Sequence, residues 1–514
     1  MRIGIDVGGT YTDAVILDGS TIVSSHKALT TVDVRHGIID ALDAVMSDGG
    51  ATPASIEAVM IGTTHFTNAV VERRELSETA IIRACLPTGS ALPPMCDWPA
   101  DMAEVVGNHV YMVSGGHLFN GKPISSLDDL EIEKVINDIA DKGIKDIAIS
   151  AVFSPANMEH EHLIAEKVRR KIPNSNISLS HEIGRLGIME RENASILNAS
   201  LGDLADRVVF NIRSALRDRR LSCPFYVSQN DGTLMSADYI ARYPALTFSS
   251  GPTNSLRGAA ILSDIDDAIV VDIGGTTSDI GVLAGGFPRE SNSHINVGGV
   301  RTNFRMPDIL SIGLGGGSLV SECGSRIGPV SSGHRLVTEG LVFGGKTITA
   351  TDIAVAASDC KLGDKKFVSG LSTDLVETAT QNIHSMIDDT VDKMRSSEAS
   401  VPVILVGGGA ILIFRELATA SKIIVPEHAG VANAIGAAVA QVGGEVERIV
   451  NYSKIPRNEV MARAKKEAQV KAVKAGAEAS TLRVQDVEET ALSYMDGDVA
   501  RIRIKVIGDL KNAV

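Results

Sequence analysis

The chain has 514 residues, and its 63 acidic and 49 basic side chains give a formal net charge of −14. At roughly 100–200 residues per domain, this length allows two or three domains. Hydrophobic residues make up 44% and charged residues 22%, as in an ordinary globular protein. The acidic balance, without a block rich in lysine or arginine, argues against nucleic acid as a partner.

The cysteines and the apolar runs bear on the cellular compartment. The five cysteines are widely spaced and include no Cys-x-x-Cys pair, so neither a disulfide framework nor a zinc knuckle is predicted. The chain opens on a strand-like run, Arg2–Ile5, without the pattern of a secretory signal. The longest apolar stretch, Val401–Phe414, is interrupted by three glycines and is too short to span a bilayer. We therefore expect a cytoplasmic protein that contacts no membrane.

Apolar runs of strand length alternate with helical patterns along most of the chain, which predicts an α/β fold. Where apolar residues recur at every third or fourth position, the pattern predicts a helix. In chain order, the expected elements are strands at Ile3–Val7, Asp13–Leu17 and Thr21–His26, a helix over Val34–Met46, a strand at Asp146–Val152, a helix over Met158–Arg170, and a long helical stretch over Glu190–Leu216 that can bridge two halves of the chain.

A repeat divides the chain into two related halves. The segment Ile5–Asp13 aligns without a gap on Val271–Asp279, and each copy reads Asp-x-Gly-Gly-Thr-x-x-Asp. Each copy lies between two strand-like runs. One glycine turn of this kind is a weak signal, whereas two with the same spacing indicate a duplicated phosphate loop.

The residue types in these loops suit a nucleotide polyphosphate. Glycine lets backbone N–H groups approach phosphate closely, and threonine adds a hydroxyl donor. Two carboxylates, Asp6 and Asp272, end the preceding strands, and opposing a polyphosphate they require a cation such as Mg²⁺ between them. Asp13 and Asp279 lie one hairpin further on, where they either reach the metal shell or cap the turn. The predicted phosphate-binding residues are Gly8, Gly9, Thr10 and Tyr11 in the first copy and Gly274, Gly275, Thr276 and Thr277 in the second.

Two more glycine loops belong to the predicted site. The run Val403–Ala410 is a buried-type strand that enters Gly407, Gly408 and Gly409 and then a helical segment, a junction that suits the adenosine side of a nucleotide. A fourth loop, Ser311–Ser318, contains Gly315 and Gly316 and is expected to line the same cleft.

Other catalytic patterns are absent from the sequence or weak. The chain contains no Gly-x-Ser-x-Gly elbow and no His-Glu-x-x-His motif. Cys323 is a candidate nucleophile, but a lone cysteine without a base is more often inert. His65, His181 and His334 lie in polar, loop-like contexts, where a structural role is more common than a catalytic one.

The tail beyond Gly443 differs in composition. Its segment Ile455–Glu478 is rich in lysine, glutamate and alanine and predicts an exposed helix. Two strands, Thr481–Tyr494 and Val499–Val506, flank the turn Met495–Asp498 and predict a hairpin. A small α+β appendage is expected.

These motifs resemble those of the hydantoinase A/5-oxoprolinase family, whose fold is that of the actin, sugar-kinase and Hsp70 ATPases. The resemblance implies a two-lobed actin-like ATPase with duplicated ribonuclease-H-like lobes, with an N-terminal lobe over 1–195, a second lobe over 196–443 and a C-terminal α+β segment over 444–514. The matching segments are Gly4–Asp13, Gly62–Thr64 with Thr67–Ala69, Glu190–Arg191 through Asn198–Ala199, Ser250–Pro252, Asp272–Asp279 and Ser311–Ser318.

The resemblance implies an ATP- and Mg²⁺-dependent opening of a cyclic amide, such as a hydantoin or 5-oxoproline, with Asp6 and Asp272 in the catalytic and metal roles. It also implies a B-type partner subunit for the hydrolytic step, and a homo- or hetero-oligomer. The sequence departs from the family pattern at Met60, where histidine is expected, and at Tyr11, where phenylalanine is usual. It is also shorter than typical A subunits.

Three other functions fit the same motifs. One is a small-molecule kinase of this fold, and another is the ATP-using subunit of a ketone carboxylase. The third is a nucleotide-switched binding protein related to actin or chaperone ATPases, although no peptide-binding β-domain follows the ATPase region.

Overall fold

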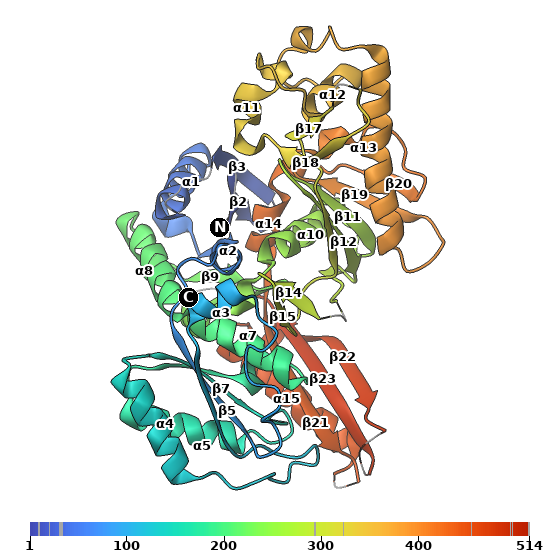
Figure 1. Ribbon diagram of the computed structural model, residues 1–514. Coiled ribbons are helices and arrows are strands. Elements are labelled where there is room, and N and C mark those ends of the chain that lie inside the picture. Colours follow the sequence, from blue (N-terminus) through green and yellow to red (C-terminus); the bar gives the residue numbers. More distant parts are fainter. Residues whose placement is uncertain are drawn as a thin grey trace.

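The computed structural model describes residues 1–8, 11–19, 21–29, 34–291, 294–321, 323–453, 455–493, 495 and 497–511. Two α/β lobes meet along a pair of central helices. Figure 1 shows the first lobe in the middle of the molecule, the second lobe above it, and a separate parallel sheet with the C-terminal strands below. Among the described residues, no helix is long and apolar enough to cross a membrane.

The first lobe is built on a nine-stranded sheet. Its β1 strand is buried from Ile3 to Val7 and pairs antiparallel with β2 and parallel with β4. Strands buried on both faces read as continuous apolar runs, which is why the sequence shows these segments without alternation. Across the sheet the order is β22 (Arg483–Ala491), β23 (Val499–Gly508), β21 (Gln441–Asn451), β10 (Thr233–Ser236), β9 (Phe225–Ser228), β4 (Ala58–Thr63), β1 (Arg2–Val7), β2 (Tyr11–Asp18) and β3 (Thr21–Leu29).

The second lobe repeats the pairing of the first. Its β11 is antiparallel to β12 and parallel to β19, as β1 is to β2 and β4. The repeat found in the sequence is therefore a repeat of structure, and the predicted actin-like α/β fold is confirmed. The sheet contains β13 (Phe287–Pro288), β12 (Ser278–Ala284), β11 (Ala268–Ile273), β19 (Val401–Val406) and β20 (Ala420–Ile424), with β16 (Ile309–Ile312) also paired to β12.

Three smaller sheets complete the fold. A parallel sheet lies between β4 and β9 in the sequence, and two hairpins extend from the second lobe. The parallel strands are β6 (His109–Ser114), β5 (Thr79–Leu86), β7 (Asp146–Ala151) and β8 (Asn176–Leu179); the hairpins are β14 (Ile295–Val297) with β15 (Val300–Thr302), and β17 (Ser318–Val320) with β18 (Ile327–Ser331).

The helices cover the faces of these sheets. In α4, for example, Ile132, Ile136 and Ile139 recur on one face and are buried, and Asp128 accepts hydrogen bonds from two backbone N–H groups of the first turn. The helices are α1 (Val34–Asp48), α2 (His65–Glu72), α3 (Ala100–Val106), α4 (Asp129–Asp141), α5 (Glu159–Lys171), α6 (Ser180–Ile183), α7 (Ile188–Ser200), α8 (Gly202–Asp218), α9 (Ala237–Arg242), α10 (Ser250–Ser263), α11 (Leu336–Glu339), α12 (Ala350–Ala357), α13 (Thr373–Met394), α14 (Ala432–Val439) and α15 (Arg457–Lys474).

The long helix predicted over Glu190–Leu216 is two helices. The first, α7, ends at Ser200, and α8 begins at Gly202, which packs against the Asp146 carboxylate so closely that a Cβ there would lie 2.4 Å from it. The first of them, α7, packs on β7 and β8 of the parallel sheet and also on β15, so it contacts the hairpin of the second lobe.

The two lobes also meet at the pair α10 and α14. A Cβ on Gly258 would lie 1.9 Å from the Ala432 carbonyl oxygen, and one on Gly436 would lie 1.9 Å from the Asn254 carbonyl oxygen. A Cβ on Gly4 of β1 would likewise lie 2.2 Å from the Ala434 carbonyl oxygen. Contacts this short explain why small residues dominate the crossing, and they fix both helices against the strands that carry the aspartates.

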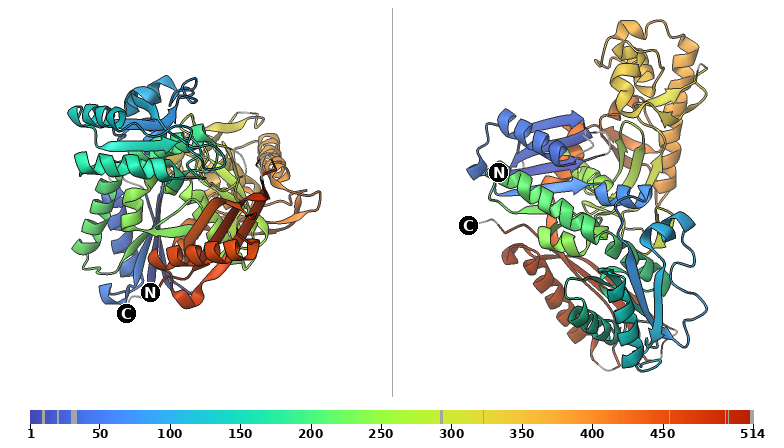
Figure 2. Two further views of the ribbon diagram at one scale, coloured as in Figure 1. Left: turned by 90° about the horizontal axis from the view of Figure 1, so that it is seen from below. Right: turned by 60° about the vertical axis from the view of Figure 1, so that its left-hand side comes forward.

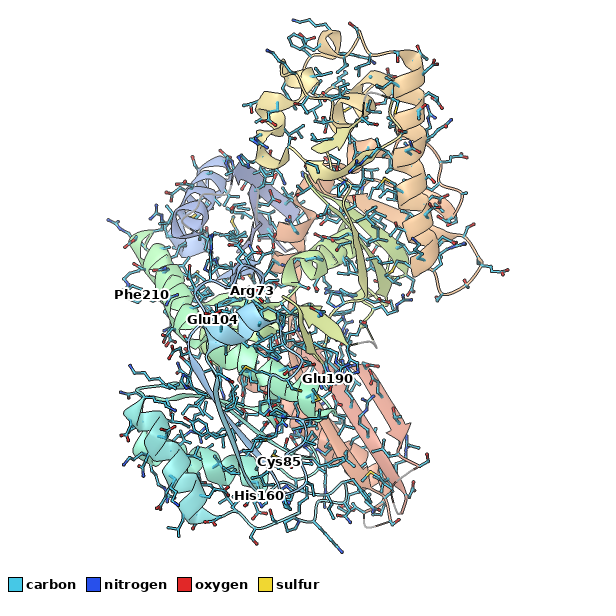
Figure 3. All side chains as sticks on the ribbon, in the orientation of Figure 1. Arg73, Cys85, Glu104, His160, Glu190 and Phe210 are labelled. Carbon is cyan, nitrogen blue, oxygen red and sulfur yellow. The ribbon has the colours of Figure 1, made fainter. Side chains whose placement is uncertain are left out.

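The β14–β15 hairpin of the second lobe lies against the first lobe. Arg73, at the C-terminal end of α2, donates from Nη2 to the Gly298 carbonyl oxygen at 2.7 Å, and Arg301 pairs with Glu190 of α7 at 2.6 Å. Figure 3 shows Arg73 and Glu190 at this junction. The lobes are therefore joined by this hairpin as well as by α10 and α14.

The C-terminal segment forms the predicted helix and hairpin but extends the sheet of the first lobe. Strand β21 pairs parallel with β10, and β23 lies between β21 and β22. Figure 2 shows α15 against one face of these strands, where Val460, Ala464, Ala468 and Ala472 are buried. The helix expected to be exposed thus has one buried face, and the turn residues Tyr494 and Asp496 lie outside the described part of the chain. The division of the chain at residues 195 and 443 stays a prediction.

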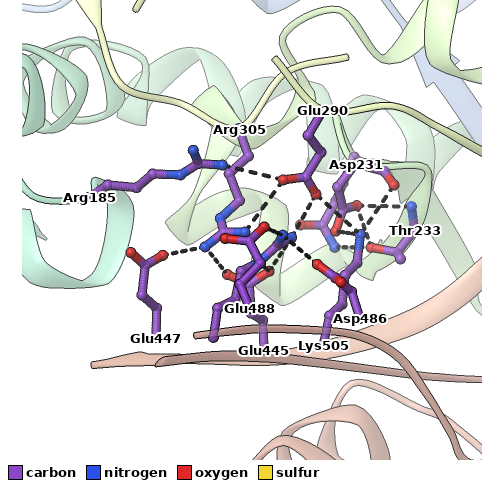
Figure 4. A network of polar contacts seen from close by, with 12 residues as sticks. Arg185, Asp231, Thr233, Glu290, Arg305, Glu445, Glu447, Asp486, Glu488 and Lys505 are labelled. Atoms are coloured by element: carbon purple, nitrogen blue, oxygen red, sulfur yellow. Dashed lines mark hydrogen bonds and ion pairs between the residues drawn. The ribbon is translucent and has the colours of Figure 1, made fainter. Parts of the chain in front are cut away.

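A buried ionic network ties this sheet to the second lobe. The side chain of Arg503, on β23, is 2% exposed and pairs with Glu290 at 2.6 Å, Glu488 at 2.7 Å, and both Glu445 and Asp486 at 3.0 Å. Figure 4 shows Glu290, which follows β13, and Arg305, which follows β15, within this network. Arg305 pairs with Glu445 and Glu447 of β21, and Glu290 pairs with Arg503 and Lys505 of β23. Burial raises the pKa of Glu445 to about 7, and Arg305 opposes the rise.

Candidate functional site

The two hairpins that carry the predicted phosphate loops have the same register. Asp6 faces Asp13 across β1–β2, and Asp272 faces Asp279 across β11–β12. Each turn is closed by the same bond: the Gly8 N–H donates to the Tyr11 carbonyl at 3.0 Å, and the Gly274 N–H donates to the Thr277 carbonyl at 2.9 Å. Gly9 and Thr10, predicted to bind phosphate, lie outside the described residues.

Asp6 is held by amides from both bridging helices. The Asn433 Nδ2 of α14 donates to its Oδ2 at 2.9 Å, and the Asn254 Nδ2 of α10 lies 3.4 Å from its Oδ1. Gly62, on β4, leaves room for this arrangement, since a Cβ there would lie 2.1 Å from the Asp6 Oδ1. Burial raises the pKa of Asp6 to about 6, and the negative charges of Asp13 and Asp272 add to the rise. Asn254 and the next residue of α10, Ser255, bond Asp6 and Asp272 respectively, so this helix brings the carboxylates of the two lobes to one place.

Asp272 has one occupied and one open oxygen. Its Oδ2 accepts a hydrogen bond from the Ser255 hydroxyl of α10 at 2.5 Å, and no described residue donates to its Oδ1. Burial raises the pKa of Asp272 to about 6; the Asp279 and Asp13 charges raise it further, whereas Ser255 and Lys27 lower it. The open oxygen can accept a cation or a water.

The outer aspartates differ between the two copies. Asp13 forms an ion pair with Lys27 of β3, whose Nζ lies 2.7 Å from Oδ1 and 2.9 Å from Oδ2. Asp279 accepts a hydrogen bond from Ser311 of β16, and no described lysine or arginine pairs with it. Burial raises the pKa of both carboxyl groups, and in Asp13 the Lys27 charge opposes the rise.

The second phosphate loop presents free donors. The side chains of Thr276 and Thr277 are exposed, and a Cβ on Gly275 would have nothing within 4 Å. Within the described residues, the N–H groups of Gly275, Thr276 and Thr277 form no hydrogen bond. A run of unpaired amides at an exposed turn is a ready site for an anionic group.

The third glycine loop adjoins Asp272. Gly407 has φ +82°, and a Cβ there would lie 2.4 Å from the Asp272 Oδ1, so only glycine fits. Gly409 donates to the Ile273 carbonyl oxygen at 2.8 Å, whereas Gly408 faces open space. The helical segment predicted after these glycines is a short 3₁₀ turn, Ala410–Leu412.

The fourth glycine loop supports the second phosphate loop. The Gly316 N–H donates to the Gly274 carbonyl oxygen at 2.9 Å, and the Gly317 N–H donates to the Gly275 carbonyl oxygen at 2.8 Å. The Gly315 N–H is also used, by the Ser318 hydroxyl at 2.8 Å. Because these amides already bond to the protein, the structure favours a packing role for Gly315 and Gly316, and their predicted contact with nucleotide is untested.

Sequence reasoning missed four side chains of this site. Asn254, Ser255 and Asn433 reach the aspartates from α10 and α14, and Lys27 reaches Asp13 from β3. The signal for the three on α10 and α14 was present in the small-residue runs around Ser250–Ser255 and Ala432–Gly436. Polar residues in such helices usually serve packing, so the sequence alone did not single them out.

The other candidates lie outside this cluster or have structural partners. His181 pairs with the buried Glu161 at 2.6 Å, in the parallel-sheet part of the molecule. His65 begins α2, directly after the strand that flanks Asp6, and burial lowers its pKa. Cys323 is exposed beside the β17–β18 hairpin, where hydrogen bonds from Ser325 lower its pKa to about 7.

The donor set fits a hard cation shared with phosphate. Among the described residues, no group of three or more His, Cys, Asp or Glu side chains is arranged to hold a metal ion. Mg²⁺ is commonly held by one or two carboxylates together with water and phosphate oxygens. Asp6 and Asp272, with an open Oδ1 on Asp272, match that requirement.

The fold and this cluster define a class: two duplicated lobes with an aspartate-bearing loop in each make up an actin-like ATPase fold. Two family models match the chain, "Hydantoinase/oxoprolinase N-terminal region" over residues 2–172 and "Hydantoinase/oxoprolinase" over residues 191–370. The chain belongs to the hydantoinase/oxoprolinase family.

Several known proteins are similar to it. The alpha subunit of caprolactamase from Pseudomonas jessenii is 27% identical over 385 residues, which is 69% of this chain and 54% of that protein. The gamma subunit of acetophenone carboxylase from Aromatoleum aromaticum is 26% identical over 392 residues, which is 69% of this chain and 52% of that protein. The matched region thus spans about half the length of these relatives.

The crystal structure of the ATP-dependent caprolactamase from Pseudomonas jessenii superposes with a TM-score of 0.80. The alignment covers 99% of this chain and 88% of that chain at 19% sequence identity. At that identity the likeness supports the fold alone.

Proposed function

We propose that this chain is the ATP-using component of an enzyme that activates a cyclic amide by phosphoryl transfer and opens its ring. The observation that carries the proposal is the position of Asp6 and Asp272, which are equivalent in the two lobes and are bonded by neighbouring residues of α10, next to the free amides of the second phosphate loop. Membership of the hydantoinase/oxoprolinase family and the likeness to a caprolactamase subunit support the substrate class.

The reaction that fits the site has two steps. The γ-phosphoryl group passes from ATP to the amide oxygen and leaves ADP. Water then adds to the activated carbon and the ring C–N bond breaks, which gives a free amine and an acyl phosphate; in the same hydrolytic step a second water converts the acyl phosphate to the carboxylate and inorganic phosphate. The protein's task in the first step is to position the phosphoryl group and neutralise its charge.

The residues of the site have separate roles in this proposal. The N–H groups of Gly275, Thr276 and Thr277 bind phosphate oxygens, and Gly408 lies towards the adenosine side. Asp6 and Asp272 hold Mg²⁺, which would offset the charge of the phosphates. Asn433 and Ser255 keep the two carboxylates in orientation. Gly9 and Thr10 would contribute the equivalent donors of the first loop.

The hydrolytic step is proposed to need a partner. The similar caprolactamase and acetophenone carboxylase chains are named as subunits, which supports a hetero-oligomer with a B-type subunit. A partner of this kind would supply the water-activating groups.

The test measures ADP release from purified protein, alone and with a co-encoded partner, across hydantoins, 5-oxoproline and larger lactams. We expect a lactam to stimulate ADP release and to yield the ring-opened amino acid when the partner is present. Asp272→Asn should abolish the ATP turnover with the fold intact. Unchanged turnover in that variant would remove Asp272 from the phosphoryl-transfer site.

A second candidate is ATP-dependent carboxylation of a ketone, favoured by the likeness to the acetophenone carboxylase gamma subunit. ADP release that depends on bicarbonate and a ketone, with no response to lactams, would support it. A stable phosphorylated product without ring opening would instead indicate a small-molecule kinase.

A further inference from the structure

Lys27 is a cation at the nucleotide site that neither the glycine loops nor the aspartates account for. It lies on β3, and its Nζ bonds both oxygens of Asp13, at 2.7 and 2.9 Å. Its side chain is 36% exposed, whereas that of Asp13 is 3% exposed. The buried carboxylate is thus fixed, and the ammonium group keeps access to solvent.

The same ammonium group also bonds the turn before α14, which is distant in sequence. It donates to the Gly430 carbonyl oxygen at 3.0 Å, in the turn that leads into α14. The neighbouring Ala429 carbonyl oxygen accepts a bond from Gly407, the first glycine of the third loop, at 2.9 Å. Lys27 therefore lies between the hairpin of the first phosphate loop and the loop assigned to the adenosine side.

The side chains around Lys27 are mostly acidic. Four carboxylates, Asp6, Asp13, Asp272 and Asp279, meet here, and among the described residues Lys27 is the only basic side chain in ion-pair contact with any of them. Its charge reaches the second lobe as well, since it lowers the pKa of Asp272. A polyphosphate that runs from the third loop to the first must pass this group.

We propose that Lys27 binds a phosphate group of the nucleotide and that Asp13 is the residue that positions it. This inference rests on the proposed use of ATP and adds a cationic ligand to it. The long lysine stem lets the Nζ turn towards a phosphate oxygen while keeping one bond to Asp13. Asp13 is then occupied by Lys27, which removes it from the metal ligands.

The second copy of the loop differs from the first at its outer aspartate. Asp279 accepts from a hydroxyl, that of Ser311, and no described lysine or arginine pairs with it. The two copies have therefore taken different tasks: the first pairs its outer aspartate with a cation for phosphate, and the second leaves its outer aspartate beside Asp272.

The test compares equilibrium binding of a non-hydrolysable ATP analogue with binding of adenosine, by calorimetry in the presence of Mg²⁺. A charge-assisted contact to phosphate predicts that Lys27→Met weakens analogue binding about 10- to 100-fold and leaves adenosine binding unchanged. Lys27→Arg should retain part of the affinity. Adenosine binding also shows that each variant has a folded site.

A double variant separates phosphate binding from simple neutralisation of Asp13. If Lys27 only neutralises that carboxylate, Asp13→Asn combined with Lys27→Met removes the unpaired charge and restores wild-type affinity for the analogue, which overturns the inference. If Lys27 binds phosphate, the double variant stays as weak as Lys27→Met. Failure of the wild-type chain to bind the analogue would overturn the proposed use of ATP together with this inference, whereas full affinity in the double variant overturns the inference alone.

Discussion

The crossing of α10 and α14 can be tested with one added methyl group. A Cβ on Gly258 would lie 1.9 Å from the Ala432 carbonyl oxygen and 2.6 Å from its carbonyl carbon. A Cβ needs at least 3.0 Å from such atoms, so in Gly258→Ala the helices must separate by about 1 Å.

Two opposing terms set the size of the effect on stability. Overpacking at a tight contact costs about 1–3 kcal/mol, and replacing glycine by alanine inside a helix returns about 1 kcal/mol. We therefore expect a net loss of about 0–2 kcal/mol in the free energy of unfolding. The effect on turnover should be larger, since α10 also carries Asn254 and Ser255, which bond Asp6 and Asp272. A displacement of about 1 Å at a reacting centre can cost about 100-fold in rate.

The assay pairs urea unfolding with steady-state ATP turnover. Gly370→Ala is the matched control, because a Cβ at Gly370 has nothing within 4 Å. The control should match the wild type in both measurements. If Gly258→Ala keeps wild-type stability and turnover, the helices are not locked at this crossing and the argument for their role fails.

Three further predictions follow from other contacts. Gly407→Ala places a Cβ 2.4 Å from the Asp272 Oδ1 at φ +82° and should abolish nucleotide binding measured by calorimetry, whereas Gly370→Ala, outside the glycine loops and with nothing within 4 Å of its Cβ, should bind normally. Arg503→Met leaves four carboxylates without their shared cation and should lower the free energy of unfolding in urea by about 3–5 kcal/mol. The control Arg213→Ala breaks only an exposed pair with Asp238 and should lower it by less than about 1 kcal/mol. Burial raises the pKa of Asp272 from 3.8 to about 6, so the folded chain keeps this proton to higher pH than the unfolded chain does. The stability that the bound proton contributes is therefore lost as pH rises from about 4 to about 6. The melting temperature of Asp272→Asn should fall less over this range than that of the wild type, and equal slopes would refute the shift.

Much of the fold could be predicted because its signals are local. The repeat Ile5–Asp13 and Val271–Asp279 fixed the two hairpins, and the apolar runs marked buried strands that are paired as expected. The helix break at Leu201 escaped prediction because the apolar period continues through it. Its cause is a tertiary contact between Gly202 and Asp146, which no local pattern encodes.

The site was predictable in its loops and not in its supports. Spacing identifies a residue that must be glycine, but the partners of Asp6 come from residues 254 and 433, which are distant in sequence. The fourth glycine loop has the composition of a phosphate loop, and only its hydrogen bonds to the Gly274 and Gly275 carbonyl oxygens show that its amides are already used. Composition predicts where the backbone can approach a ligand, and tertiary bonding decides whether it is free to do so.

The duplication also separates geometry from charge. Both copies hold the pair of aspartates in the same register, so a backbone comparison gives Asp13 and Asp279 the same role. Their neighbours do not: Lys27 neutralises Asp13, whereas Asp279 has a hydroxyl partner and raises the pKa of Asp272. Negative charge without a paired cation is therefore concentrated on Asp6, Asp272 and Asp279. A cation that enters with the nucleotide should be drawn to the Asp272 side of the site, and removal of Asp279 by Asp279→Asn should weaken Mg²⁺ binding more than the equivalent change at Asp13.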